Sequence, residues 1–318
     1  MTTMTNPANL PPAIFLMGPT ASGKSRIALD IARIFPAEIV SVDSAQVFRH
    51  MDIGTAKPDP QTLAEIPHHL INLIDPNDHY TAARFRSDAL TATADISQRG
   101  KIPILSGGTM LYFRALQEGL SALPPADKDF RLSIEAMAKD VGWPALHQKL
   151  NELDPDSAAR IKPTDSQRIQ RALEVCYLTR QPMSVLLKTS KVADLPYRII
   201  RIALLPRDRS VLHQRIADRF KAMLATGLID EVQRIRQQFT VTTESPSMRC
   251  VGYRQTCLYL DNAIDLAALH DMGTAATRQL AKRQLTWLRG MTNQPPREFD
   301  CLAENCSEQV LAYLRTTI

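Results

Sequence analysis

The sequence predicts an α/β protein in which a parallel sheet of P-loop type is flanked by helices and interrupted by a helical insertion domain. First, an apolar run, a glycine-rich loop and a helical pattern follow one another over residues 13–34. Second, apolar runs alternate with helical segments through the front third of the chain. Third, residues 124–197 have a helical pattern only, before an apolar strand resumes at residues 198–205. We therefore expect ligands at the carboxyl ends of the parallel strands.

The first element is a short apolar strand at residues 13–17, followed by the pattern G-x-x-x-x-G-K-S and a helix over residues 26–34. A phosphate-binding loop requires this order, because backbone N–H groups and the positive end of the helix converge on one anion. Lys24 adds a charge at the terminal phosphate, and the Ser25 hydroxyl is the candidate ligand for Mg²⁺. The loop is predicted to bind a di- or triphosphate, the alternative being a glycine turn without chemical meaning. Its residues are Gly18, Pro19, Thr20, Ala21, Ser22, Gly23, Lys24 and Ser25.

Three further strands are predicted at residues 38–43, 69–74 and 102–106. Asp43 ends the first of these strands, and a Gly-Gly-Thr sequence ending at Thr109 follows the last. Since the carboxyl ends of parallel strands meet at one edge of a sheet, the glycine loop, Asp43 and Thr109 are expected to converge on one site.

The chain is expected to divide into four parts. A flexible tail, residues 1–11, precedes the first part of the P-loop core at residues 12–123. The helical insertion domain occupies residues 124–197. The second part of the core, with C-terminal helices, occupies residues 198–318. Helices are predicted over residues 212–236 and 275–288.

Composition describes an ordinary globular protein of 318 residues, of which 44% are apolar. No apolar run approaches the ~18 residues that a membrane span needs, and the first ten residues lack a signal-peptide pattern. We therefore expect a cytoplasmic protein without membrane association. The five cysteines are scattered and include no C-x-x-C pair, so reduced structural thiols are favoured over a metal site at Cys301 and Cys306.

The formal net charge of +5 is modest, but basic residues cluster after the P-loop region. Arg168 and Arg171 are three residues apart, which places them on one helix face. Other clusters surround Tyr253 and Trp287. A single cluster is usually a solvated face, but three clusters, two of them with aromatic residues, favour a polyanionic partner larger than a nucleotide. The later clusters contain Arg249, Arg254, Arg278, Lys282, Arg283 and Arg289.

Six motifs in a fixed order carry a resemblance. They are GPTASGKS at residues 18–25, SVDSAQ at 41–46, MDIGTAK at 51–57, GGTMLY at 107–112, RCVGYRQ at 249–255 and KRQLTWLR at 282–289. With these motifs the sequence resembles the bacterial type of the tRNA isopentenyltransferase family, whose members are tRNA dimethylallyltransferases. The resemblance covers residues 12–290, which is nearly the whole chain. Two positions depart from the family pattern. Many relatives carry Leu or Val where this chain has Gln46, and Tyr where it has Phe48.

The resemblance implies transfer of a dimethylallyl group from dimethylallyl diphosphate to N6 of adenosine 37, next to the anticodon of tRNA, with release of diphosphate. The P-loop would then hold the leaving group, with Mg²⁺ as cofactor. Asp43 matches the family's general base, with a Mg²⁺ ligand and a turn cap as its alternatives. The Thr109 hydroxyl is expected to reach the acceptor amine and the bridging oxygen of the donor, its alternative being a helix cap. Arg219 matches a diphosphate contact, with Arg215 or a surface role as alternatives.

The resemblance also implies contact with the anticodon stem-loop of tRNA, from which the stacked adenine must be extruded. The helical insertion is expected to clasp the stem, and the enzyme is expected to be a monomer. Tyr253 and Trp287 are candidates for base stacking, although such aromatic residues more often belong to the core. The implied tRNA-contacting residues are Asp43, Ser44, Ala45, Gln46, Thr109, Arg131, Gln167, Arg168, Ile169, Gln170, Arg171, Arg249, Cys250, Val251, Gly252, Tyr253, Arg254, Lys282, Arg283, Gln284, Leu285, Thr286, Trp287, Leu288 and Arg289.

Two other function classes stay open from the residues alone. A small-molecule P-loop kinase accounts for the first forty residues but not for the basic clusters. An RNA-dependent ATPase or a non-catalytic RNA-binding module accounts for the charge but gives the Gly-Gly-Thr sequence at residues 107–109 no role. The P-loop pattern is also compatible with ATP binding.

Overall fold

The computed structural model describes residues 10–121, 123–188, 195–291 and 294–318. The chain falls into two compact units. Unit 1 comprises Met1–Leu116 and Leu195–Ile318, and unit 2 comprises Gln117–Asp194. Within the described ranges, no helix combines the length and apolar character needed to cross a bilayer. All five cysteines carry free thiols.

Unit 1 is built on a six-stranded sheet in which every pair of neighbours is parallel. The strand order is β3-β2-β4-β1-β5-β6, so the predicted α/β fold with a parallel sheet is confirmed. The P-loop strand β1 lies inside the sheet, between β4 and β5. The strands are β1 (Pro12–Met17), β2 (Ala37–Val42), β3 (His68–His69), β4 (Ile102–Gly107), β5 (Arg198–Leu205) and β6 (Arg297–Asp300).

The strand predicted at residues 69–74 is wrong beyond its first residue. Leu70 and Asn72 have positive φ angles of 63° and 55°, which a β-strand does not accommodate. The backbone leaves the sheet here and pairs instead with the segment after β2, where the N–H of Leu73 donates to the carbonyl oxygen of Val47 at 2.7 Å. The apolar run at residues 70–74 therefore indicates burial but not a strand, because its backbone pairs with a loop.

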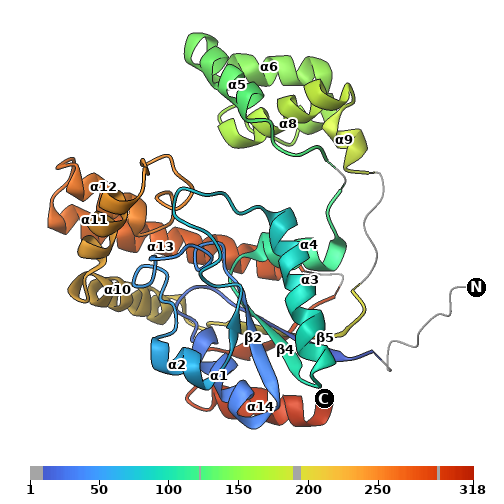
Figure 1. Cartoon of the computed structure of the whole chain (residues 1–318), viewed down its shortest axis with the longest axis vertical. Helices are drawn as coiled ribbons and strands as arrows, with labels where there is room; N and C mark the ends of the chain where they lie inside the picture. Colours follow the sequence, from blue (N-terminus) through green and yellow to red (C-terminus); the bar gives the residue numbers. More distant parts are fainter. Residues whose placement is uncertain (1–9, 122, 189–194, 292–293) are drawn as a thin grey trace, which may run out of the picture. The chain divides into compact units, whose positions relative to one another are not determined.

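The two faces of the sheet bury alternate residues of each strand. Ile14 and Leu16 pack in a core with α1 (Lys24–Ile34) and α14 (Cys306–Thr317). Phe15 and Met17 belong to a second core, to which α3 (Ala82–Gln98) and α4 (Met110–Glu118) contribute. Figure 1 shows α1 and α14 on one side of the strands and α3 on the other. This layering leaves the carboxyl ends of the strands open to ligands.

A group of helices follows β5. The single helix predicted over residues 212–236 is two helices, because Gly227 has a φ of 102° and ends the first of them. The helix predicted from Ala275 begins earlier, where the Asp265 side chain caps it by accepting from the N–H of Ala268. The helices are α10 (Arg209–Ala225), α11 (Leu228–Gln238), α12 (Tyr253–Leu260) and α13 (Leu266–Arg289), and α2 (Pro60–Glu65) lies earlier in the chain.

A charged network lies at the amino-terminal end of β2. The Glu38 side chain is 2% exposed and accepts hydrogen bonds from Arg99, from Lys101 at 2.8 Å and from His69 at 2.7 Å. These bonds, led by that of Arg99, hold the pKa of Glu38 well below its usual range, although burial opposes ionisation. The network lies at the amino-terminal ends of the strands, whereas Asp43 and Thr109 follow their carboxyl-terminal ends.

Unit 2 is helical throughout its described elements. Its core contains Ile134, Leu150, Ile169 and Leu173. Proline at the start of α6 and α7 fits the first helical turn, where its missing N–H is not needed. The helices are α5 (Lys128–Val141), α6 (Trp143–Leu153), α7 (Pro155–Ala158), α8 (Ser166–Thr179) and α9 (Met183–Leu186).

Candidate active site

A cavity of about 650 Å³ opens at the carboxyl ends of β1, β2 and β4 in unit 1. We call it the reaction cleft. Lys24 and Ser25 of the P-loop, Asp43 after β2 and Thr109 after β4 all line it. The structure thus brings together the three segments whose convergence the strand ends predict. The Met51–Lys57 loop and α13 complete its walls.

The P-loop is held in its curled shape by close packing. A Cβ on Gly18 would lie 2.9 Å from the carbonyl oxygen of Leu204, so a side chain does not fit there. Gly23 has a φ of 82°, which brings the chain into the start of α1. In this shape the Lys24 ammonium donates to the carbonyl oxygen of Pro19 at 2.7 Å.

Two cations, Lys24 and Arg219, line the cleft, and among the described residues neither forms an ion pair with a carboxylate. Burial, followed by the charge of Arg219, lowers the pKa of Lys24 to about 8, although the charge of Asp43 opposes this. Arg219 projects from α10, and burial lowers its pKa as well. Within the part of the chain that the structure describes, Arg219 makes no hydrogen bond or ion pair. Arg215, one turn earlier, donates to the carbonyl oxygen of Cys301 at 3.3 Å and does not line the cleft. The geometry therefore favours Arg219 over Arg215 as an anion contact.

Asp43 uses one carboxylate oxygen to hold its own turn. Oδ1 accepts from the N–H of Ala45 at 2.8 Å and from the N–H of Gln46 at 3.4 Å. Among the described residues, Oδ2 has no hydrogen-bond partner. The turn-cap role and a chemical role are therefore compatible, since each has its own oxygen.

Thr109 is tied to the same turn. Its hydroxyl oxygen accepts from the N–H of Ser44 at 3.0 Å and lies 3.3 Å from the hydroxyl of Ser44. Its own N–H donates to the carbonyl oxygen of Val42 at 3.2 Å. The close approach of β4 to β2 requires glycine at position 107, two residues before Thr109, because a Cβ there would lie 2.0 Å from the same carbonyl oxygen of Val42. The Asp43 turn and Thr109 thus form one rigid wall.

A buried carboxylate that the sequence analysis missed holds the Met51–Lys57 loop. Glu231 on α11 is 4% exposed and accepts from the N–H groups of Asp52, Ile53 and Gly54 at 2.7–3.2 Å. It also accepts the hydroxyl hydrogen of Tyr253 at 2.5 Å. The signal in the sequence is an acid on the apolar face of a helix, since Glu231 is three residues after Leu228 and four before Ile235.

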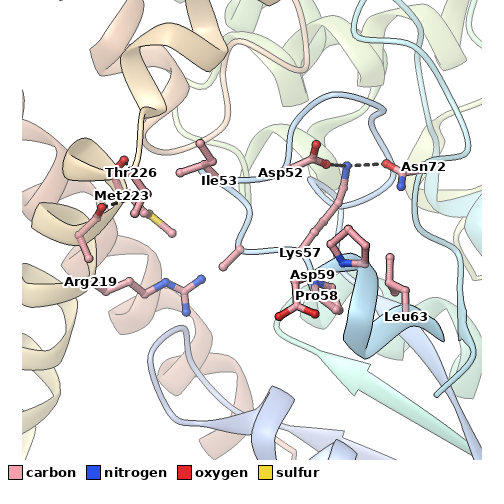
Figure 2. A pocket seen from close by; sticks show the side chains of 13 residues that line it. Asp52, Ile53, Lys57, Pro58, Asp59, Leu63, Asn72, Arg219, Met223 and Thr226 are labelled. Carbon is pink, nitrogen blue, oxygen red and sulfur yellow. Dashed lines mark hydrogen bonds and ion pairs between the residues drawn. The ribbon is translucent and has the colours of Figure 1, made fainter. Parts of the chain in front are cut away.

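A second cavity of about 500 Å³ shares Ala56 and Arg219 with the reaction cleft. Figure 2 shows Arg219 of α10 on one side of it and Lys57 on the other. Lys57 donates to Asp52 at 2.9 Å and to Asn72 at 2.6 Å, and burial lowers its pKa. Arg219 lines both cavities. The Met51–Lys57 loop therefore lies between them.

The two C-terminal motif blocks divide into exposed and buried members. Arg249, Arg283 and Trp287 line the reaction cleft, and Arg249, Arg254, Lys282, Arg283, Thr286, Trp287 and Arg289 are exposed. The Arg114 guanidinium lies 5.8 Å from the centre of the Trp287 ring. Base stacking by Tyr253 is wrong, because its ring is fully buried in the core of the helical group. Leu285 and Leu288 are buried as well, so their side chains serve packing rather than tRNA contact, and Gly252 is buried too.

Cys250 and Val251 are intermediate in exposure between these two groups. Both line the reaction cleft and are partly exposed. Burial raises the pKa of the Cys250 thiol to about 12. The thiol therefore stays protonated at neutral pH and does not act as a nucleophile.

The predicted tRNA contacts of unit 2 form a cluster of their own. Glu174 is fully buried and accepts from Arg131 at 2.8 Å and from Arg171 at 2.5 Å. Burial opposes its ionisation, but these bonds outweigh burial and lower its pKa. Ile169 lies in the core, so tRNA contact by this side chain is wrong. Gln167 and Arg168 are exposed, and Gln170 is partly exposed.

The residues present fit a magnesium ion only with help from a substrate. Ser25 is exposed in the cleft. No group of three or more His, Cys, Asp or Glu side chains among the described residues is arranged to hold a metal. Mg²⁺ commonly binds through one or two protein oxygens together with phosphate and water. The donor set is therefore adequate for a metal that arrives with a diphosphate, and a cysteine site at Cys301 and Cys306 is not supported.

A family model described as IPP transferase matches residues 46–291. The tRNA dimethylallyltransferase of Nitrosospira multiformis is 64% identical over 307 residues, which cover 96% of this chain and 94% of the relative. That of Nitrosomonas europaea is 62% identical over 301 residues, covering 95% and 94%. The likeness therefore extends over nearly the full length of both chains.

Solved structures share the fold. The tRNA isopentenylpyrophosphate transferase of Bacillus halodurans has a TM-score of 0.70 and 33% identity, covering 97% of this chain and 96% of that one. A eukaryotic dimethylallyltransferase acting on tRNA has a TM-score of 0.80 and 26% identity, covering 96% and 79%. The similarity thus includes both the fold and the sequence.

Proposed function

Because the chain belongs to the IPP transferase family, we propose that it transfers a dimethylallyl group from dimethylallyl diphosphate to N6 of adenosine 37 in tRNA and releases diphosphate. One observation carries the proposal. The reaction cleft places two partly buried cations, Lys24 and Arg219, in the same cavity as an available carboxylate oxygen of Asp43. A leaving anion and a departing proton each have a partner in this arrangement.

The cationic side of the cleft suits the leaving group. Lys24 and Arg219 are both positively charged and repel each other. A bound diphosphate would neutralise this repulsion. The P-loop N–H groups and the positive end of α1 add to this attraction. As the bond from carbon to the bridging oxygen breaks, the electron pair stays with the diphosphate, and the same groups stabilise the charge that develops there.

The acidic side of the cleft suits the acceptor. A bond forms between N6 of adenine and the allylic carbon, and the amine must lose a proton. We assign that proton to Oδ2 of Asp43, while Oδ1 keeps the turn in place through Ala45. The Thr109 hydroxyl, fixed beside this turn, orients the amine.

We assign the metal site to Ser25 together with the bound diphosphate. Mg²⁺ would add positive charge at the departing oxygens. The positions of Lys24 and Arg219 do not depend on the ion, since both are set by α1 and α10. The charge that these residues supply is therefore present with or without it.

We assign tRNA binding to the exposed basic residues around the cleft and to unit 2. Arg249, Lys282 and Arg283 are exposed near the cleft and would contact phosphates of the anticodon stem-loop. Gln167 and Arg168 of unit 2 would clasp the stem. We further propose that the enzyme acts as a monomer in the cytoplasm.

The test is a transfer assay with purified protein, labelled dimethylallyl diphosphate, unmodified tRNA and magnesium. The proposal expects N6-dimethylallyladenosine beside the anticodon, with no requirement for a nucleoside triphosphate. Phosphorylation of a small molecule by ATP would instead support a P-loop kinase. ATP hydrolysis stimulated by RNA would support the ATPase. Failure to form the modified nucleoside with both substrates present would overturn the proposal.

A further inference from the structure

Gln284 connects two segments of the reaction cleft that are far apart in the sequence. Its side chain lies on the inner face of α13, and the residue is 9% exposed. The N–H of Thr20 donates to its Oε1 at 2.9 Å, and its Nε2 donates to the carbonyl oxygen of Gly108 at 2.9 Å. These partners fix the orientation of the amide, because an N–H must face the oxygen and a carbonyl must face the nitrogen.

The two partners belong to the two sides of the proposed reaction. Thr20 is part of the P-loop, and Gly108 directly precedes Thr109. Gln284 packs tightly against Gly108, since a Cβ on that residue would lie 2.3 Å from Nε2 of Gln284. A shift of either loop would break one of the bonds, and each would leave a poorly hydrated backbone group without a partner.

We propose that Gln284 is a positioning residue for the transfer, which sets the spacing between the diphosphate cradle and the Thr109 wall. The inference rests on the proposed function of the cleft. It replaces direct tRNA contact, the role that the motif at residues 282–289 implies for this position. The residue is only 9% exposed, and both the oxygen and the nitrogen of its amide already have partners inside the protein, which favours internal alignment over RNA contact.

α13 also carries exposed side chains next to Gln284. Arg283 and Trp287 flank Gln284 on the same helix, are exposed and line the same cleft. A tRNA held by these residues would thus dock on the element that aligns the two loops. Binding and alignment are separable, since different side chains of α13 perform them.

The first experiment replaces the amide without changing the volume much. Gln284→Met keeps an unbranched side chain and removes both hydrogen bonds. We expect kcat for transfer to fall by about 10- to 100-fold, the loss that a misplaced reacting group causes, while the Kd for tRNA stays within about twofold. Gln279→Met is the matched control, because Gln279 is exposed on the same helix and does not line the cleft. The control should match the parent in both values.

The second experiment restores one bond by pH. In Gln284→Glu, one carboxylate oxygen still accepts from Thr20, but the other opposes the carbonyl oxygen of Gly108 until it is protonated. The ratio of the variant's kcat to that of the parent should therefore rise as pH falls from 8 to 5.5. Any group that titrates in both proteins changes both kcat values alike, so the ratio cancels its effect. Gln284→Met should show no such rise.

Two results would overturn the inference. One is a parent-like kcat in Gln284→Met together with weaker tRNA binding, which would mean direct contact with RNA. The other is a pH-independent ratio for Gln284→Glu, and this result decides even if Gln284→Met does not fold. A parent enzyme that makes no modified nucleoside would instead contradict the proposed function itself, so the two failures are distinguishable.

Discussion

The carboxylate of Glu231 and the hydroxyl of Tyr253 form a fully buried hydrogen bond of 2.5 Å between α11 and the start of α12. The same carboxylate holds three backbone N–H groups of the Met51–Lys57 loop. The Tyr253 ring packs so closely on this loop that a Cβ on Gly54 would lie 2.4 Å from it. One wall of the reaction cleft thus depends on a helix that contributes no side chain to the cleft surface.

Replacing Glu231 should destabilise the protein and loosen this wall. Glu231→Gln places an NH₂ group among donors, and we expect the free energy of unfolding in urea to fall by about 3 kcal/mol. Tyr253→Phe loses one bond and should cost about 1 kcal/mol. The double variant should cost less than the sum, because the tyrosine bond is already impaired in Glu231→Gln. Additive losses would show that the two residues act independently.

Binding of the donor should depend on the charge of Lys24. Its pKa is lowered to about 8, so the side chain is mostly charged at pH 7 and mostly neutral at pH 9. A bound anion raises that pKa again, so the affinity for a non-reactive thio-analogue of the donor should fall as pH rises above 8. Calorimetry at pH 9 in two buffers should show uptake of about one proton on binding. The phosphates of the analogue do not titrate there, since their last pKa is about 6.

Lys24→Arg is the control for this titration. Arginine keeps its charge throughout this range, so the variant should bind the analogue without proton uptake and without the decline above pH 8. A decline of equal size in the variant would assign the pH dependence to another group.

The roles of the two carboxylate oxygens of Asp43 can be tested separately. Asp43→Asn keeps an Oδ1 that accepts from Ala45 but cannot take a proton from N6. We expect turnover to fall by about 10²- to 10⁴-fold in Asp43→Asn and Asp43→Ala, with tRNA affinity within a few fold of the parent. Only Asp43→Ala should also lose stability, because it alone leaves the turn uncapped. Normal single-turnover chemistry combined with lost binding would contradict the base assignment.

The exposed cations of α13 should bind tRNA through phosphates. Lys282→Ala and Arg283→Ala should each weaken tRNA binding and reduce the slope of log K against log salt by about one. Arg315→Ala removes an equal charge from α14, on a helix that does not line the cleft, and should leave the slope unchanged. Slopes equal to the parent in both α13 variants would mean that these side chains face away from the RNA.

The Glu38 network should govern stability in acid. Its folded-state pKa lies below the unfolded value of about 4.3, so its stabilisation is complete above that pH and is lost as pH falls through the folded-state pKa. Glu38→Gln should lower the free energy of unfolding by about 3 kcal/mol at pH 7. The difference from the parent should shrink below pH 4. A constant difference down to pH 3 would show that the carboxylate does not titrate with unfolding.

Local sequence patterns predicted the parts of the molecule that depend on local geometry. The P-loop, the four longest strands before residue 206 and the placement of Asp43 and Thr109 at strand ends follow from short apolar runs and glycine positions. The break at Gly227 escaped prediction because a helical pattern continues on both sides of it. Glu231 escaped prediction, and Gln284 was assigned to tRNA contact, because their hydrogen-bond partners lie about 180 to 260 residues away. No periodicity reports such distant pairings.

The pairing of β1 with β5 has a consequence for synthesis of the chain. Pro12 is aligned with Arg198, and unit 2 is translated between the two strands. Until residue 205 leaves the ribosome, β1 can pair only with β4, and its other edge presents unpaired backbone beside an apolar core. The nascent polypeptide therefore carries an incomplete sheet with an aggregation-prone edge for much of its elongation. A chaperone that shields this edge would raise the yield of active protein.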